Sequence, residues 1–201
     1  RLVGSEMCIR DRHMIRLRHA GQINGTEAKE IILLNSHDGS SSYQMLAGVF
    51  RFVCHNGLVC GDTVADIRIP HKGNVTERVI EGAFEVLDQF DNVENHMDAM
   101  KSVTLNALEK RIFADAALAL RYDEKDGPAP IAASQLLEAR RFEDRKDDLW
   151  TTFNRVQENI IRGGLSARTK QGKSTRTRAV TGMDKDTSLN RALWILSERM
   201  N

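Results

Sequence analysis

The chain has 201 residues, of which 41% are hydrophobic and 28% charged, a composition typical of a globular protein rather than a disordered or fibrous one. Its 29 basic and 28 acidic residues give a formal net charge of +1, so the overall charge does not indicate a partner. No stretch approaches the roughly 20 apolar residues that span a bilayer, no secretion signal opens the chain, and the cysteines number three. These features predict a cytoplasmic protein with reduced thiols and no membrane partner.

The first twelve residues differ in character from the rest. They lack a starting Met and a clear hydrophobic period, and residues 5–12 (SEMCIRDR) closely resemble the translated read-through of a sequencing adapter at the ends of genes assembled from environmental DNA. We therefore expect residues 1–12 to be a non-native scar, with part of the natural N-terminus missing. A frayed natural terminus is the alternative. Residues 13–201 are expected to form a single α+β domain.

Residues 13–73 are predicted to be β-rich, with three to five antiparallel strands. Apolar, β-branched and aromatic runs alternate with stretches rich in Asn, Ser and Gly, which favour turns. Asn56-Gly57 is typical of a two-residue hairpin turn. The expected strands are 14–19, 30–34, 43–53, 58–60 and 64–69.

A change of hydrophobic period at Asn74 predicts that residues 74–201 are helical. Asn74 and Glu77 have the spacing of a capping box, and apolar residues then recur in steps of four and three. They are Val79, Ala83, Val86, Phe90, Val93, Met97 and Met100. This heptad spacing fits a long helix packed on the sheet or a coiled-coil seam, and the first is preferred because Ala, Met and Phe are weaker seam residues than Leu and Ile. The second interpretation predicts a homo-oligomer through helix 79–100.

Helices and loops are predicted to alternate in the C-terminal half. Helical spacing continues over 105–120, and the two prolines of 123–130 indicate a loop. Asp147 or Asp148 can cap a helix that ends at Gly163-Gly164. Further helices are expected over 134–141 and from about Asp186. The predicted fold class is α+β: an antiparallel β-meander followed by a long helix and a helical C-terminal half.

The stretch most informative about function is the basic loop, residues 162–178. Residues 159–183 contain no acidic residue, so positive charge is concentrated here in a chain that is nearly neutral overall. The basic residues are Arg162, Arg168, Lys170, Lys173, Arg176 and Arg178. Its Gly, Ser and Thr residues predict a mobile segment whose hydroxyl groups can reach phosphate oxygens. The six cations are therefore predicted to bind the phosphates of a nucleic acid, with single-stranded DNA favoured; a solvated surface loop is the alternative.

Two residues of the preceding helix have two interpretations each. Arg155 is predicted to help bind nucleic acid, and it could equally form a salt bridge with Glu158 or Asp148. Trp150 could stack on a base, but packing in the core is preferred because tryptophan supplies so much apolar area.

The main alternative is a metal-dependent hydrolase or nuclease that uses His37, Asp38 and His55. Triad residues normally come from distant chain positions, so neighbours in one turn rarely form that geometry. The residue types of a zinc site are also present, in Cys54, His55, Cys60 and His71. The five residues between the two cysteines exceed the usual zinc-ligand spacing. No metal, cofactor or catalytic residue is therefore predicted.

Three segments resemble an uncharacterised family of phage-like and plasmid-like proteins, a domain of unknown function, and the resemblance extends over residues 13–201. They are 33–58 (LLNSHDGSSSYQMLAGVFRFVCHNGL), 148–164 (DLWTTFNRVQENIIRGG) and 189–194 (LNRALW). The resemblance implies a bacterial protein carried on prophages and conjugative plasmids, in a family whose members are longer at the N-terminus. The order of strands followed by a helix is also similar to the core of single-strand annealing proteins, which bind the DNA backbone in a basic groove and act as oligomers.

Together these features predict a non-enzymatic nucleic-acid-binding protein of phage or plasmid DNA metabolism, acting in single-strand binding or annealing. The hydrolase or nuclease is the first alternative. The second is an oligomeric host-interaction protein that self-associates through helix 79–100.

Overall fold

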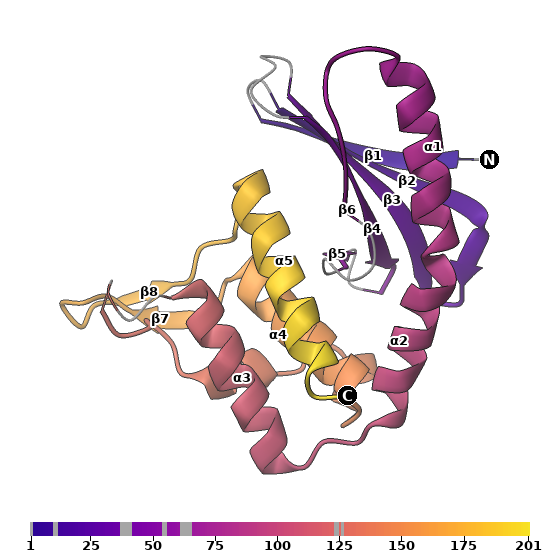
Figure 1. Cartoon of the computed structure of the whole chain (residues 1–201). Helices are drawn as coiled ribbons and strands as arrows, with labels where there is room; N and C mark the ends of the chain where they lie inside the picture. The colour runs from indigo at the N-terminus through magenta and orange to yellow at the C-terminus, as the bar shows by residue number, and fades with distance from the viewer. Residues whose placement is uncertain are drawn as a thin grey trace. The chain divides into compact units, whose positions relative to one another are not determined.

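A computed structural model of the chain has the predicted α+β fold (Figure 1). The residues that it describes are 2–9, 12–36, 42–53, 56–60, 66–122, 125 and 127–201. They fall into two compact units, residues 1–95 and residues 96–201. The first unit holds the main antiparallel sheet and the second is mostly helical. Whether the two units unfold together, as a single domain would, stays a prediction.

The sheet of the first unit is the predicted antiparallel meander. Its strands are β1 (Leu2–Ile9), β2 (Arg12–Asn24), β3 (Glu27–Ser36), β4 (Tyr43–Arg51), β5 (Asn56–Val59) and β6 (Asp66–Ile69). They are ordered β1-β2-β3-β4-β5, and β6 also pairs with β4. The strand β1 lies in the segment predicted to be a scar, so the structure adds a strand that the sequence analysis had set aside.

The prediction of a hairpin turn at Asn56-Gly57 is wrong. Both residues lie inside β5, opposite Arg51 and Phe50 of β4. The glycine leaves space there, because a Cβ atom on Gly57 would lie 2.3 Å from Nη1 of Arg16 and the guanidinium group would have to move. Gly57 therefore allows a guanidinium group to lie against the backbone of the strand.

The predicted long helix is two helices, α1 (Val75–Asp88) and α2 (Phe90–Ser102), separated at Gln89. Asn74 caps α1 as predicted, accepting a hydrogen bond from the Glu77 amide at 3.4 Å. The helix α1 packs on β3, β4 and β6, and a Cβ on Gly82 would lie 3.0 Å from Sδ of Met45.

Packing within the chain accounts for five of the seven heptad residues. Val86, Phe90, Val93, Met97 and Met100 are all buried. The packed-helix interpretation therefore explains their spacing, since hydrophobic burial alone selects such a stripe. Self-association through helix 79–100 stays a prediction and would have to use other side chains of the helix.

Among its described residues, the second unit holds three complete helices, two short 3₁₀ turns and a hairpin. These elements are α3 (Ala107–Arg121), η2 (Ala133–Leu137), η3 (Phe142–Arg145), α4 (Leu149–Arg162), β7 (Ser166–Arg168), β8 (Ser174–Arg176) and α5 (Met183–Glu198). As predicted, Asp148 caps α4 and Gly163 ends it. None of the helices in the described part of the chain has the length and apolar character that crossing a membrane requires.

The helix predicted over 134–141 is replaced by the 3₁₀ turns. Side chains of α4 bind the carbonyl groups of this segment: Asn159 donates to Leu136 O and Glu138 O, both at 2.9 Å, and Arg155 donates to Leu137 O at 3.2 Å. Carbonyl groups engaged by another element cannot all serve as acceptors in an α-helix.

The core of the second unit contains an aromatic cluster. The Trp150 ring lies 5.7 Å from the Phe153 ring and 6.5 Å from the Trp194 ring, measured between centroids. All three residues are buried, and Trp150 is only 3% exposed. The preferred interpretation, that Trp150 packs in the core, is confirmed.

Candidate nucleic-acid interface

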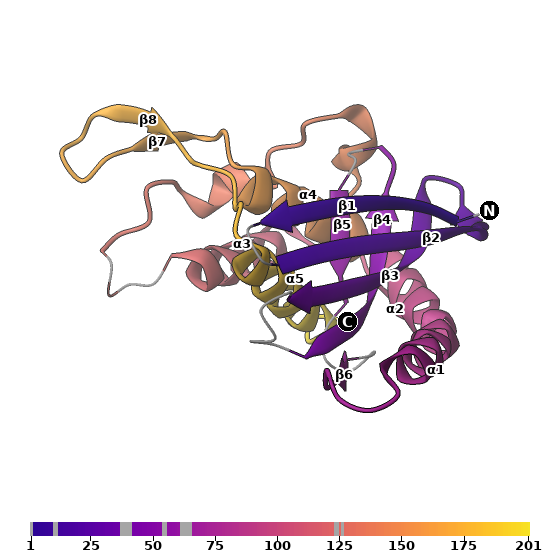
Figure 2. The same cartoon turned by 90° about the horizontal axis from the view of Figure 1, so that it is seen from above.

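The predicted basic loop contains a two-stranded antiparallel hairpin, β7 and β8, which extends from the edge of its unit (Figure 2). Arg168 pairs with Ser174, and Ser166 pairs with Arg176. Residues opposite each other, and residues two positions apart, share one face of a ribbon. Arg168 and Arg176 therefore lie on one face, while Ala167, which is buried, lies on the other.

Hydrogen bonds order the turn of the hairpin, which the sequence predicted to be mobile. The Thr169 amide donates to Lys173 O at 2.9 Å, and the Gly172 amide donates to Thr169 O at 2.8 Å. The Thr169 hydroxyl accepts from the Lys173 amide at 3.1 Å. Gly172 has a φ of +79°, which glycine adopts without steric cost. The glycine and threonine residues thus form a defined turn between two exposed lysines, Lys170 and Lys173.

The base of the hairpin is fixed to the rest of its unit by backbone hydrogen bonds. The Gly164 amide donates to Thr177 O at 2.8 Å, and the Thr177 amide donates to Leu165 O at 2.9 Å. On the outer edge, the Arg168 amide donates to Pro130 O at 3.1 Å. The basic side chains are therefore presented from a fixed backbone.

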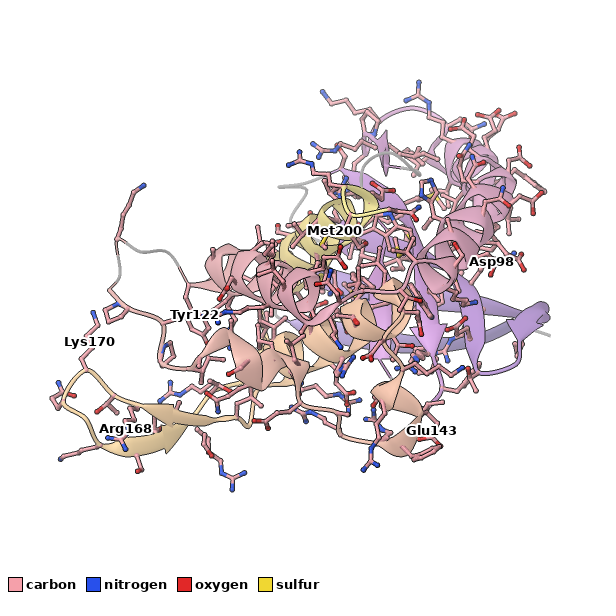
Figure 3. The ribbon with its side chains drawn as sticks, turned by 90° about the horizontal axis from the view of Figure 1, so that it is seen from below. Asp98, Tyr122, Glu143, Arg168, Lys170 and Met200 are labelled. Atoms are coloured by element: carbon pink, nitrogen blue, oxygen red, sulfur yellow. The ribbon has the colours of Figure 1, made fainter. Side chains whose placement is uncertain are left out.

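A groove of about 660 Å³, which we call the basic groove, runs between the hairpin and the segments 121–122 and 127–130. Five of its lining residues are basic: Arg121, Arg168, Lys170, Arg176 and Arg178. No carboxylate is among the described residues that line it. The aromatic residue Tyr122 and the hydroxyl groups of Thr169, Thr175 and Thr177 also line the groove. Tyr122, Arg168 and Lys170 gather at the hairpin end of the unit in Figure 3, and Glu143 lies at the other end.

A second groove, of about 900 Å³, also adjoins the hairpin. It is lined by residues 129–132, by Gln135 and by strand residues that include Arg168 and Arg176. Gln135 joins the two sides, because its Nε2 donates to Ser166 O at 2.9 Å. The guanidinium groups of Arg168 and Arg176 thus border both grooves.

The structure brings together four of the seven residues predicted to bind nucleic acid: Arg168, Lys170, Arg176 and Arg178 line the basic groove. Lys173 lies in the exposed turn of the hairpin. Arg162 lies at the end of α4 and pairs with Glu158 at 3.3 Å.

Arg155 is placed differently from the other six. It is only 9% exposed, and it donates to Leu137 O at 3.2 Å and to Lys146 O at 3.1 Å. Burial lowers the pKa of its guanidinium group, against the opposing effect of nearby carboxylates. These contacts give Arg155 a structural role in binding the segment that precedes α4.

Sequence reasoning missed two residues of the basic groove, Arg121 and Tyr122. They end α3, far from the basic loop in the sequence, and Arg121 Nη2 donates to Arg178 O, 57 positions away. A basic and an aromatic residue just before the predicted loop 123–130 are the one local signal that could have indicated them.

The alternative catalytic residues His37, Asp38 and His55 lie outside the described residues, as does Cys54. Cys60 is buried, and the His71 ring packs on Tyr43, with 4.4 Å between the ring centroids. Within the described ranges, no three His, Cys, Asp or Glu residues are grouped so that they could hold a metal ion.

Comparisons with known proteins place most of the chain in one family. The model described as Domain of unknown function (DUF932) matches residues 7–194. UPF0380 protein YafZ of Escherichia coli (strain K12) is 54% identical over 189 residues, which are 94% of this chain and 68% of that protein. UPF0380 protein YfjQ of the same strain matches with the same identity and coverage. No solved structure matches the chain. The resemblance to an uncharacterised family, a domain of unknown function, is thereby confirmed, while its prophage and plasmid setting stays a prediction. The chain belongs to the DUF932 family.

Proposed function

We propose that this protein binds nucleic acid in the basic groove and acts without catalysing a reaction. The observation that supports the proposal is the convergence of five basic side chains from two distant segments on one groove, with no carboxylate among its described lining residues. Positive charge concentrated in this way favours a polyanion, because each neutralised phosphate releases condensed counterions.

The chemistry of the lining groups suits phosphate. Guanidinium groups bind phosphate through two parallel hydrogen bonds, and hydroxyl groups add further contacts to phosphate oxygens. Four of the five cations are arginines. The described lining residues offer cations and hydroxyl groups, which bind phosphates, and this is why we assign the groove a binding role.

The prophage and plasmid setting implied by the sequence resemblance is consistent with this role, because proteins of mobile elements often handle DNA. Single-strand binding or annealing is the form of DNA handling that we favour. The alternative hydrolase or nuclease depends on His37, Asp38 and His55 and stays a prediction of the sequence.

The proposal is tested by removing the charge of the groove while keeping its polar surface. The groove variant carries Arg168→Gln, Lys170→Gln, Arg176→Gln and Arg178→Gln. The control variant carries Lys72→Gln, Arg78→Gln, Arg145→Gln and Lys146→Gln, which neutralise the same number of exposed cations elsewhere. Fluorescence anisotropy with a labelled oligonucleotide measures the affinity of each protein.

Loss of four phosphate contacts should weaken binding by the groove variant on the order of 100-fold at physiological salt. The control variant should stay within about threefold of the wild type, because distant exposed charges are screened. Equal losses in the two variants would show that only net charge matters, and that result would contradict the proposal.

A further inference from the structure

Tyr122 occupies a distinctive position in the basic groove. It is the C-cap of α3, with an extended backbone (φ −116°, ψ 104°), and its amide donates to Leu118 O at 3.0 Å. The chain thus leaves the helix at this residue, and the half-buried side chain lines the groove together with Arg168 and Lys170. Figure 3 shows these three side chains at the same end of the unit.

The Tyr122 ring is held beside the cations of the groove. The guanidinium carbon of Arg121 lies 5.2 Å from the ring centroid, within the range of a cation–π contact. Arg121 also donates to the carbonyl oxygen of Arg178, on the far side of the groove. One arginine therefore connects the ring to the segment that follows β8.

Other aromatic residues of the second unit are unsuited to binding a ligand in this groove. Phe113, Trp150, Phe153 and Trp194 are buried. Of the aromatic side chains described in this unit, Tyr122 and Phe142 remain accessible, and Tyr122 alone lines the basic groove. Phe142 is 78% exposed on η3, with the guanidinium carbon of Arg145 5.6 Å from its ring centroid.

We propose that Tyr122 is a stacking platform for an unpaired base, so that the basic groove takes single-stranded nucleic acid in preference to a duplex. This inference rests on the proposed function. Single-strand binding sites combine a basic groove that follows the backbone with aromatic side chains on which bases stack. The bases of a duplex are already stacked on one another, so they cannot use the ring without being unstacked.

The experiment removes the aromatic ring from the protein and, separately, the bases from the nucleic-acid probe. Tyr122→Leu removes the aromatic face and keeps an apolar side chain, Tyr122→Phe keeps the ring, and Phe142→Leu removes an exposed aromatic ring outside the groove. Each protein is titrated with three labelled probes of equal length: an oligothymidylate, an abasic oligonucleotide with the same phosphates, and a duplex. Near-ultraviolet circular dichroism of the buried tryptophans confirms that each variant is folded.

Tyr122→Leu should weaken binding of the oligothymidylate roughly 5- to 100-fold, the range found for one base–aromatic stack. Its affinities for the abasic strand and the duplex should match those of the wild type, because no base reaches the ring there. Tyr122→Phe and Phe142→Leu should bind all three probes as the wild type does.

Three results would overturn the inference, and each identifies which part of it is wrong. If Tyr122→Leu binds the oligothymidylate normally while the groove variant has lost binding, the proposed function stands and the stacking role of Tyr122 is wrong. If Tyr122→Leu lowers the affinity for all three probes equally, the ring contributes only to the structure of the groove and does not stack on a base. If the folded wild type binds none of them, the proposed function fails and the inference fails with it.

Discussion

Gly163 is the residue on which the attachment of the hairpin depends most directly. It ends α4 with φ +65° and ψ −144°, a conformation that is essentially restricted to glycine. A Cβ at this position would lie 2.7 Å from the carbonyl oxygens of both Thr177 and Arg178. Gly163 therefore lets the segment that follows β8 pass against the end of α4.

Replacing Gly163 with alanine should destabilise the protein through both strain and collision. Gly164 is a matched control, since it also has a positive φ, +79°, but nothing lies within 4 Å of its Cβ position. Gly163→Ala should lower the free energy of unfolding by about 3 kcal/mol and Gly164→Ala by about 1 kcal/mol. Urea denaturation measures both, and equal losses would contradict the close approach at Gly163.

Glu30 is a fully buried carboxylate in the sheet of the first unit. Arg16 Nη1 donates to its Oε2 at 2.8 Å, and Arg18 Nε lies 2.9 Å from its Oε1. The second pair is too poorly aligned for a hydrogen bond, so neither Arg18 Nε nor Glu30 Oε1 has a hydrogen-bond partner. Burial raises the pKa of Glu30 above its ordinary 4.5, and its two arginine neighbours only partly oppose this.

A raised pKa makes the contribution of Glu30 to stability depend on pH. Between 4.5 and the raised value, the folded state holds the proton more tightly than the unfolded state, so stability falls as the pH rises. The free energy of unfolding of the wild type minus that of Glu30→Gln should therefore increase as the pH falls from neutral towards 4.5. This difference grows by roughly 1.4 kcal/mol for each unit by which folding raises the pKa of Glu30. Urea denaturation across this range would contradict the assignment if the difference decreased instead.

Gly57 shows why single residues could be misread from sequence. Asn56-Gly57 carries the standard signal of a hairpin turn, but a glycine is equally required where another group approaches the backbone. That group is Arg16, which is 41 positions away in the sequence. Local patterns do not distinguish these two causes.

At the scale of elements, α4 organises the second unit through its polar residues. Every residue from Leu149 to Ile161 is buried, including several polar ones. Glu158 accepts from Arg141 at 2.5 and 2.7 Å, and Arg162 lies 3.3 Å from it. Asn159 accepts from Arg140 Nε at 2.6 Å. Side chains of α4 thus hold a segment that has little regular secondary structure of its own.

Asn159→Ala should test this organising role. The substitution removes the acceptor for Arg140 and two donors to backbone carbonyls at a site that is 1% exposed. Unsatisfied buried groups should cost about 3 kcal/mol in the free energy of unfolding. Asn92→Ala, on the exposed surface of α2, should cost less than about 0.5 kcal/mol. A small effect of Asn159→Ala in urea denaturation would show that the segment is held by other contacts.

Elements with strong local signals were predicted well. Asn74 and Asp148 cap their helices and Gly163 ends α4 because capping depends on neighbouring residues. The break at Gln89 was missed, since apolar residues keep their spacing across it. The hairpin was also missed, because its Ser, Thr and Gly residues are typical of loops and its strands are only three residues long.

At the scale of the whole molecule, the strands-then-helices order indicated the α+β class, and the charge distribution indicated the basic segment. Neither could reveal the basic groove, which forms only when the end of α3 meets the hairpin. Arg121 and Tyr122 come from one segment and the other cations from another, so the site is a product of tertiary structure. The sequence located most of the cations and missed the aromatic residue beside them.

The central claim is that the basic groove binds a chain of phosphates, and the salt dependence of the wild type tests it most directly. Anisotropy of a labelled oligothymidylate should give a log affinity that falls linearly with log salt. Each of the five lining cations should contribute roughly −0.7 to the slope, or about −3.5 in total. Binding that is independent of salt, or no binding by the folded protein, would contradict the account.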